Sequence, residues 1–227
     1  MKITLIETVA EADNITTFKW KPEKPVAYEA GQFVEMTLAH PNSDGRGDKR
    51  WFTLSSAPTE PFLSITTKFF TEKSSSFKKA LFALKPGNSA EINQPEGNFV
   101  LPTDPNLQLL FIAGGIGITP YHSMVRFLTD KHEKRTIKLL YAAQTEAGLL
   151  FSDLFQSYGA EVKPFVGKRL TTDLLMQEIG SPDGKLVYIS GPEQMVDSLS
   201  DSLVKAGLPA DSLKSDYFPG YENDYSI

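Results

Sequence analysis

The sequence predicts two domains: an antiparallel β-barrel over residues 1–103, followed by an α/β, Rossmann-like domain with a parallel sheet over residues 104–227. In the first part, short runs of β-branched and aromatic residues are separated by polar residues, Pro or Gly, which is typical of a barrel or sandwich. In the second part, apolar runs alternate with helical patterns, which favours parallel strands joined by crossovers. The change falls at residues 101–106, whose two prolines and polar residues indicate a linker.

The first domain is predicted to contain short strands at residues 3–9, 15–20, 33–38 and 63–70. Their β-branched and aromatic side chains pack well on a pleated sheet. Residues 40–49 form a polar loop that contains Pro, Asn and two Gly. Apolar residues at helical spacing predict a helix over residues 76–84, and Lys85-Pro86-Gly87-Asn88 ends it.

The second domain is predicted to alternate strands at residues 107–113, 137–143, 162–166 and 186–190 with helices at residues 120–128, 150–157, 172–179 and 195–206. The strands are apolar without alternation, as expected where helices cover both faces of a sheet. We therefore expect a doubly covered parallel sheet of about five strands.

The composition excludes several classes of chemistry. The chain has 227 residues, 41% of them hydrophobic, and no cysteine. Disulfides, cysteine-ligated iron–sulfur clusters, cysteine-ligated zinc and thiol catalysis are therefore excluded. The three histidines are scattered without zinc-site spacing, so we expect no metal site.

The charge distribution argues against nucleic-acid binding. Residues 1–103 carry 12 basic and 12 acidic side chains, whereas residues 104–227 carry 11 and 16, which accounts for the net charge of −5. No basic face of the kind that binds nucleic acid is expected. The longest apolar run, residues 109–118, is too short to span a bilayer and contains glycines. The N-terminus shows no signal-peptide pattern, so we expect a cytoplasmic protein without a membrane span.

A glycine-rich turn, Gly114-Gly115-Ile116-Gly117-Ile118-Thr119-Pro120, joins a predicted buried strand to a predicted helix. Thr119 is a favourable N-cap and Pro120 a favourable first helical residue. Glycines let the backbone approach a ligand closely, and a helix start offers free N–H groups to an anion. A pyrophosphate fits such a turn. Alternatively, the segment is a tight strand-to-helix connection that binds nothing.

A second segment, Arg50-Trp51-Phe52-Thr53, places a cation and aromatic rings beside a hydroxyl group. Arg50 can pair with a phosphate through its planar guanidinium. Strand alternation puts Arg50 and Phe52 on one face and Trp51 and Thr53 on the other. A strand end or a bulge is therefore needed to bring Phe52 and Thr53 to one ligand. Taken alone, the segment is more typical of an amphipathic strand with a surface arginine.

In this order, the two segments resemble the motifs of the ferredoxin–NADP reductase superfamily. The flavin domain of that superfamily carries Arg-x-Tyr-Ser/Thr, matched by Arg50-Trp51-Phe52-Thr53, and its nicotinamide domain carries Gly-Gly-x-Gly-Ile/Val-Thr-Pro, matched at residues 114–120. Gly31-Gln32-Phe33 and Gly191-Pro192 match two further landmarks. The resemblance covers nearly the whole chain and implies that residues 1–103 bind FAD and residues 104–227 bind NAD(P)H.

The resemblance also implies roles for individual residues. Arg50 holds the FAD pyrophosphate, Phe52 stacks on the flavin ring, and Thr53 lies near the flavin nitrogen that accepts hydride. Thr53 and Ser190 are the expected catalytic residues. The expected cofactor contacts are Arg50, Trp51, Phe52, Thr53, Thr66, Lys68, Ser75, Ser76, Gly115, Gly117, Thr119, Gln144, Arg169, Gly191 and Phe218. Phe218 or Tyr221 covers the other flavin face, unless these two aromatic residues only pack the C-terminus.

Three positions depart from the motifs of the superfamily. Phe52 replaces the usual Tyr, which keeps stacking and loses a phenol. Ser190 replaces the usual Cys beside the nicotinamide, which keeps a hydrogen-bonding group and loses a soft thiol. Gln144 stands where relatives that prefer NADPH often have Arg, so a 2′-phosphate lacks a charged partner there. Lys168-Arg169 can compensate, and we expect a slight preference for NADH.

The predicted function is an FAD-dependent NAD(P)H oxidoreductase that passes hydride from nicotinamide to flavin and then electrons to a separate acceptor. The acceptor is a ferredoxin, a flavodoxin, a cytochrome or a small molecule, and the sequence indicates no oligomeric state. One alternative is a flavin-binding electron-transfer or regulatory subunit that is active only in a complex. Another is a nucleotide-binding module without flavin.

Overall fold

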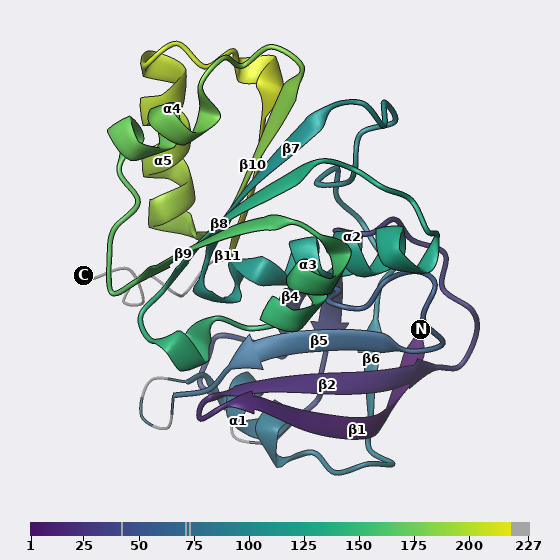
Figure 1. Cartoon of the computed structure of the whole chain (residues 1–227). Coiled ribbons are helices and arrows are strands. Elements are labelled where there is room, and N and C mark those ends of the chain that lie inside the picture. Colours follow the sequence, from purple (N-terminus) through teal and green to yellow (C-terminus); the bar gives the residue numbers. More distant parts are fainter. Residues whose placement is uncertain (42, 71, 73, 219–227) are drawn as a thin grey trace. The chain divides into compact units, whose positions relative to one another are not determined.

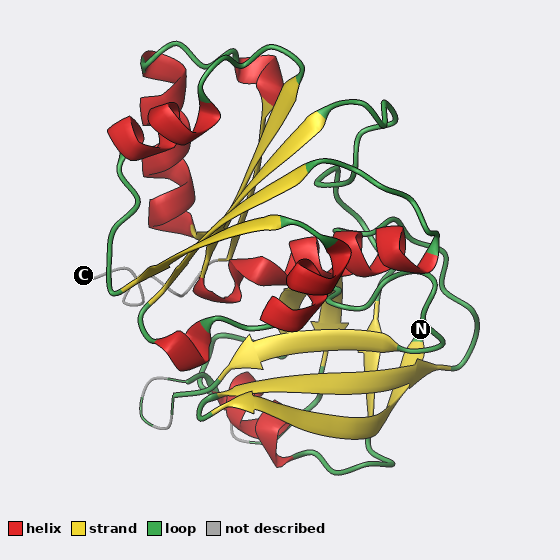
Figure 2. Ribbon diagram, viewed as in Figure 1, coloured by secondary structure: helices red, strands yellow, loops and turns green. Residues whose placement is uncertain are grey.

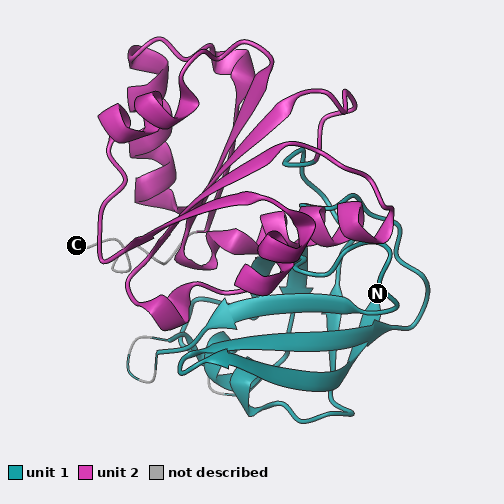
Figure 3. Ribbon diagram, in the orientation of Figure 1, with its two compact units in different colours: residues 1–100 teal, residues 101–227 magenta. Residues whose placement is uncertain are grey.

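The computed structural model describes residues 1–41, 43–70, 72 and 74–218 of the chain. The chain divides into two compact units, Met1–Val100 and Leu101–Ile227 (Figure 3). The first unit contains an antiparallel sheet and the second a parallel sheet covered by helices (Figure 2). The predicted fold class is therefore confirmed.

The first unit is built on six strands: β1 (Lys2–Ala12), β2 (Ile15–Pro22), β3 (Phe33–Thr37), β4 (Lys49–Thr53), β5 (Leu63–Lys68) and β6 (Ser89–Ile92). Their order in the sheet is β4-β3-β6-β1-β2-β5, and every pairing is antiparallel. Just beyond β4, the Ser55 N–H donates to the Ser64 carbonyl of β5 at 2.8 Å. The sheet therefore curls until its two edge strands approach each other, as in a barrel.

Alternation along the strands fills the inside of this barrel with apolar side chains. Val34 and Met36 point inward from β3, and Trp20 does so from β2. Helix α1 (Ser76–Ala83) adds Phe77 and Leu81 to the same core. Burial of these side chains stabilises the unit and fixes the start of α1 against the barrel.

The second unit alternates strands and helices: β7 (Gln108–Gly114), α2 (Thr119–Asp130), β8 (Ile137–Ala143), α3 (Ser152–Tyr158), β9 (Glu161–Val166), α4 (Thr172–Ile179), β10 (Lys185–Pro192), α5 (Glu193–Lys205) and β11 (Leu213–Phe218). The five strands pair in parallel in the order β11-β10-β7-β8-β9. The chain runs outward from β7 through β8 to β9 and then returns to the other side of β7 with β10 and β11. The strand order therefore reverses between β7 and β10, and ligands of such sheets bind beyond the carboxyl ends of the strands at that point.

Helices cover both faces of this parallel sheet (Figure 1). On one face, α4 and α5 contribute Leu175 and Leu199 to a core with Ile112 and Val187 of the central strands. On the other face lie α2 and α3, and Tyr121 of α2 stacks on Phe111 of β7 with ring centroids 4.4 Å apart. Burial on both faces is the reason why these strands are apolar without alternation.

Two strands of the structure do not follow from the sequence pattern. β6 has only four residues, and β11 is an edge strand whose side chains alternate between half-buried and exposed. Both are too short or too polar to stand out by periodicity, and pairing with a longer neighbour specifies them instead. Within the residues that the structure describes, no helix is long and apolar enough to cross a bilayer. The same residues contain no group of three His, Asp or Glu side chains that could hold a metal ion.

Candidate functional site

The glycine-rich turn follows β7 directly and winds into α2. Gly115 has φ +52°, a left-handed conformation that favours glycine, and starts a 3₁₀ turn over Gly115–Ile118. The predicted N-cap at Thr119 is wrong. Ile118 precedes α2 and is already helical (φ −69°, ψ −20°), so the 3₁₀ turn continues into the helix without an extended capping residue. Thr119 is instead the first residue of α2, and Pro120 lies in its first turn.

Gly117 is required because the turn presses on the end of β10. A Cβ atom on Gly117 would lie 2.2 Å from the Ser190 carbonyl oxygen and 2.7 Å from the Gly191 Cα. Both distances are well inside van der Waals contact, so no other residue fits there without movement of the backbone. The structure therefore brings Gly117 together with Ser190 and Gly191.

The remaining predicted residues of the second unit lie at the carboxyl edge of the same sheet. Gln144 follows β8, and Arg169 comes shortly after β9. The ends of these strands are joined because the Gly167 N–H donates to the Ala143 carbonyl at 2.9 Å. Phe218 ends β11 opposite Pro192, whereas Tyr221 lies outside the described residues. The edge thus offers backbone N–H groups, hydroxyls and an exposed cation, a donor set that suits an anionic nucleotide.

Ser190 has the most informative side chain at this edge. It is fully buried, and its Oγ has no hydrogen-bond partner among the described residues. Leaving a buried hydroxyl unsatisfied costs about 1–3 kcal/mol. A polar ligand at this edge would remove that cost, so the residues present fit a nucleotide cofactor.

In the first unit, Arg50 and Phe52 lie on the face of β4 that looks toward α1. The Arg50 guanidinium carbon lies 5.3 Å from the centroid of the Phe77 ring, and the Phe52 and Phe77 centroids are 6.0 Å apart. Trp51 lies on the opposite face, 56% exposed and against Phe33. Phe52 is only 7% exposed, so in this structure its ring belongs mainly to the barrel core.

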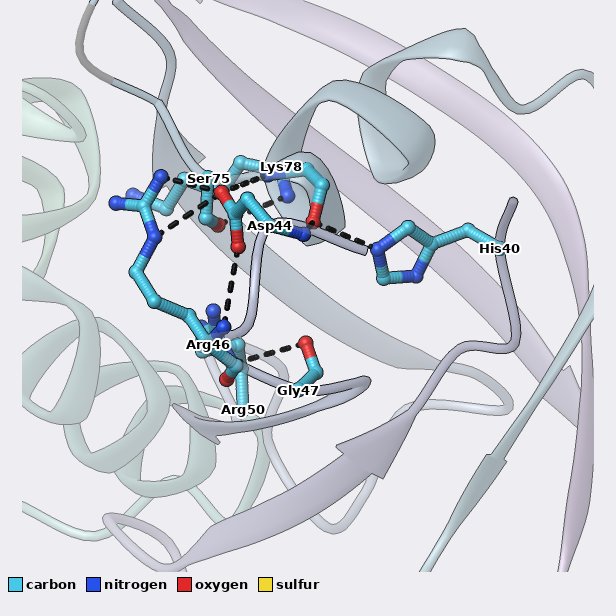
Figure 4. A network of polar contacts seen from close by, with 8 residues as sticks. His40, Asp44, Arg46, Gly47, Arg50, Ser75 and Lys78 are labelled. Carbon is cyan, nitrogen blue, oxygen red and sulfur yellow. Dashed lines mark hydrogen bonds and ion pairs between the residues drawn. The ribbon is translucent and has the colours of Figure 1, made fainter. Parts of the chain in front are cut away.

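The predicted residues Ser75 and Ser76 form the start of α1. Figure 4 shows Ser75 and Lys78 close to Asp44 and Arg46. Ser75 is the N-cap, and its Oγ accepts a hydrogen bond from the Lys78 N–H at 3.2 Å. The Ser76 N–H donates to the Asp44 carboxylate at 2.8 Å, and the Asp44 N–H donates to the Ser76 Oγ at 3.1 Å. The start of α1 therefore already holds one negative group.

His40 completes this network from the other side of Ser76. Its Nδ1 lies 2.8 Å from the Leu38 carbonyl oxygen, which can only accept, so Nδ1 carries a hydrogen. Its Nε2 lies 2.9 Å from the Ser76 Oγ. His40 and Asp44 thus contact the Ser76 hydroxyl from two sides.

The network has the charge pattern of an anion site. The Arg46 guanidinium and, second, the Ser76 N–H hold the pKa of Asp44 below its usual range. Burial and the neighbouring Arg46 lower the pKa of Arg50, although an arginine remains charged at neutral pH. The Asp44 carboxylate occupies the position at the helix start where a phosphate is favourable. The residues present thus fit the pyrophosphate of a dinucleotide.

No pattern in the sequence points to this network. His40, Asp44 and Arg46 lie in a stretch that is recognisable only as a polar loop, and 32 residues separate Asp44 from Ser76. Local patterns do not reveal such a contact, because it depends on how the loop returns to the barrel.

The other three residues predicted to contact the flavin, Thr53, Thr66 and Lys68, lie in different environments. Thr66 is buried, and its Oγ1 lies 2.8 Å from the Thr17 Oγ1 and 3.0 Å from the Ser55 Oγ. Lys68 ends β5, and its carbonyl accepts from the Lys78 Nζ at 3.0 Å. Thr53 is buried at the end of β4. Thr66 therefore belongs to a row of buried hydroxyls, whereas the Lys68 backbone is joined to α1.

Comparison with known proteins agrees with this description. Residues 111–201 match the family model of the oxidoreductase NAD-binding domain. Flavohemoprotein A of Dictyostelium discoideum is 26% identical over 92% of this chain, and the match spans 58% of that protein. The reductase subunit of glycine betaine monooxygenase from Chromohalobacter salexigens is 28% identical over 66% of this chain and 40% of its own length. The chain therefore spans about half the length of these curated relatives.

The fold is shared with solved structures. A ferredoxin NADP⁺ reductase from Neisseria gonorrhoeae, crystallised with FAD and NADP, superimposes with a TM-score of 0.79 over 96% of this chain and 98% of its own, at 17% identity. Residues 111–201 therefore resemble an oxidoreductase NAD-binding domain, and the chain shares the two-part fold of this ferredoxin NADP⁺ reductase.

Proposed function

We propose that the chain is an FAD-dependent NAD(P)H reductase that passes hydride from nicotinamide to flavin and electrons on to a separate acceptor. Residues 1–103 bind FAD and residues 104–227 bind NAD(P)H. The observation that carries the proposal is the glycine turn pressed against Ser190 and Gly191, in a segment that matches an NAD-binding domain. When bound, FAD would supply a ring that accepts one hydride, equivalent to two electrons, and that can release these electrons singly or together.

On the flavin side, Arg50 and the start of α1 bind the pyrophosphate. The planar guanidinium suits a bidentate contact with phosphate oxygens, and the Ser75 and Ser76 hydroxyls add donors. The Ser76 N–H becomes available once the Asp44 carboxylate releases it. Thr53 lies near the flavin nitrogen that receives hydride.

On the nicotinamide side, Gly115, Gly117 and Thr119 line the pyrophosphate. The unpartnered Ser190 hydroxyl hydrogen-bonds the nicotinamide and orients it for hydride transfer. This is catalysis by positioning, since a ring held in the reactive orientation removes much of the entropic barrier. Gln144 and Arg169 would hold the 2′ end of the adenosine.

We place the acceptor outside these 227 residues, which contain no cysteine to ligate an iron–sulfur cluster. A ferredoxin, a flavodoxin, a cytochrome and a small molecule remain as candidates. The relative named as a reductase subunit supports a second possibility, in which the chain works only inside a complex.

Rapid mixing with reduced nucleotides distinguishes these two functions. We expect the purified protein to be yellow and its flavin absorbance to bleach in a single fast phase when NADH is added without oxygen. NADPH should bleach it more slowly. A flavin that neither nucleotide reduces would favour the subunit, and a colourless protein that cannot be reconstituted with FAD would contradict both.

Gln144→Arg should shift the preference toward NADPH. A guanidinium at this position gives the 2′-phosphate a charge-assisted hydrogen bond, so we expect the NADPH-to-NADH ratio of kcat/KM to rise about tenfold. Ala147→Arg adds the same charge to the same exposed segment and serves as the control. Equal shifts in both variants would mean that general electrostatics, rather than position 144, sets the preference.

A further inference from the structure

The phenol of Tyr141 joins two segments that the proposed function assigns to the nicotinamide cofactor. Tyr141 lies in β8 and is 1% exposed. Its Oη lies 3.1 Å from the Gly115 carbonyl oxygen, 2.9 Å from the Gly148 carbonyl oxygen and 3.3 Å from the Leu150 nitrogen. One side chain therefore contacts both the glycine turn and the segment that follows β8.

The hydrogen-bonding capacity of this phenol is fully used. A phenol donates one hydrogen and can accept another. The Leu150 N–H occupies the accepting side, so the carbonyls of Gly115 and Gly148 share the single donated hydrogen. Burial raises the pKa of Tyr141, so the hydrogen stays on the oxygen throughout the physiological pH range.

The hydrogen bond from Tyr141 to the Gly115 carbonyl determines the direction of the following backbone N–H, that of Ile116. In a planar trans peptide, the carbonyl and the following N–H point in opposite directions. A Gly115 carbonyl held toward Tyr141 therefore directs the Ile116 N–H away from Tyr141. The first N–H groups of a helical turn have no partner within it, so this donor is suited to an anion. Gly115 has no side chain to restrain its own φ of +52°, and Tyr141 supplies the restraint.

The other two bonds fix the segment that begins at Gln144. Its internal contacts are short-range, such as the Gly148 N–H to the Thr145 carbonyl at 3.0 Å. Tyr141 holds this segment at Gly148 and at Leu150, close to where α3 begins. Beyond the sheet pairing that places Gln144 at the end of β8, this hydroxyl group links residues 148–150 to the glycine turn.

We propose that Tyr141 is a positioning residue for the nicotinamide cofactor, and that it holds the glycine turn and the segment after Gln144 in the arrangement that binds one dinucleotide. This inference rests on the proposed nicotinamide site and adds a residue that the glycine motif does not contain. Tyr141 acts through Gly115, Gly148 and Leu150, without touching the nucleotide.

The test uses Tyr141→Phe in the full chain, with ADP-ribose as the probe, because ADP-ribose contains the adenosine and the pyrophosphate without the nicotinamide. Tyr158→Phe is the matched control. Its phenol also donates one hydrogen bond, to the Glu133 carbonyl at 3.1 Å, and accepts one, from the Arg135 N–H at 2.7 Å, near the start of β8. Both variants lose a buried hydroxyl and keep the ring.

Calorimetric titration should show that Tyr141→Phe binds ADP-ribose about tenfold more weakly, the usual effect of losing one such hydrogen bond, whereas Tyr158→Phe binds it as the wild type does. Melting temperatures should fall by similar amounts in both variants. The NADPH-to-NADH ratio should also change only in Tyr141→Phe. A purely structural role for Tyr141 would not separate the variants in this way.

Unchanged affinity in Tyr141→Phe, or an equal loss in Tyr158→Phe, would overturn the inference and leave the proposed function intact. A wild-type protein that does not bind ADP-ribose would refute the nicotinamide site itself, and the inference with it. Hydrogen exchange on the wild type gives a second test that needs no variant. ADP-ribose should protect residues 115–118 and 145–150 together, and protection of only one of these segments would contradict the coupling.

Discussion

Gly117→Ala should destabilise the second unit by about 3 kcal/mol or more, a lowering of its melting temperature by about 10 °C. The new Cβ would lie 2.2 Å from the Ser190 carbonyl oxygen and 2.4 Å from the carbonyl carbon. These are backbone atoms at the carboxyl end of a central strand, so they cannot move as a flexible side chain can. Either β10 shifts away from the turn or the turn unwinds.

Gly148→Ala is the control for Gly117→Ala. The Cβ it adds would lie 3.4 Å from the Ala143 Cβ, an ordinary contact. The free energy of unfolding should then change by no more than about 1 kcal/mol. Thermal and urea unfolding of both variants, followed by circular dichroism, measure the difference. If Gly117→Ala unfolds as Gly148→Ala does, the turn does not press on Ser190.

The contrast between Gly117 and Gly148 shows which features of the glycine turn can be predicted from the sequence. The motif predicts the turn, the strand before it and the helix after it, because clustered glycines between a buried strand and a helical pattern mark a tight connection. It does not reveal that Gly117 meets Ser190, which lies 73 positions further along the chain. Only the parallel pairing of β7 with β10, Ala113 opposite Ser190, brings the two together.

In the first unit, too, the sequence predicts local features but not contacts between distant segments. Alternation along β4 correctly separates Arg50 from Trp51, since this follows from the geometry of any strand. The loop residues Asp44 and His40 could not be assigned, because their partner Ser76 comes from a distant element. Local periodicity thus predicts elements and faces, while contacts between loops require the assembled sheet.

Arg50→Ala should weaken FAD binding about 100-fold while changing the stability of the apoprotein by less than about 1 kcal/mol. In the structure, the guanidinium lies over Phe77 at 5.3 Å and donates to the Arg46 carbonyl at 2.9 Å, contacts that contribute little where the group is partly exposed. With a pyrophosphate, it would supply charge-assisted hydrogen bonds in pairs. Removing the guanidinium therefore weakens FAD binding far more than it destabilises the apoprotein. Titration of the apoprotein with FAD measures the change in affinity.

Two further variants separate charge from shape at this position. Arg50→Lys keeps the positive charge but cannot form the planar two-point contact, so its affinity for FAD should fall between those of the wild type and Arg50→Ala. Arg126→Ala removes an exposed arginine paired with Asp130 on α2 and should leave FAD affinity unchanged. Equal affinity in Arg50→Lys and the wild type would mean that charge alone is sufficient. Retention of FAD by Arg50→Ala at wild-type affinity would remove Arg50 from the site and leave the start of α1, with Ser75 and Ser76, as the remaining anchor for the pyrophosphate.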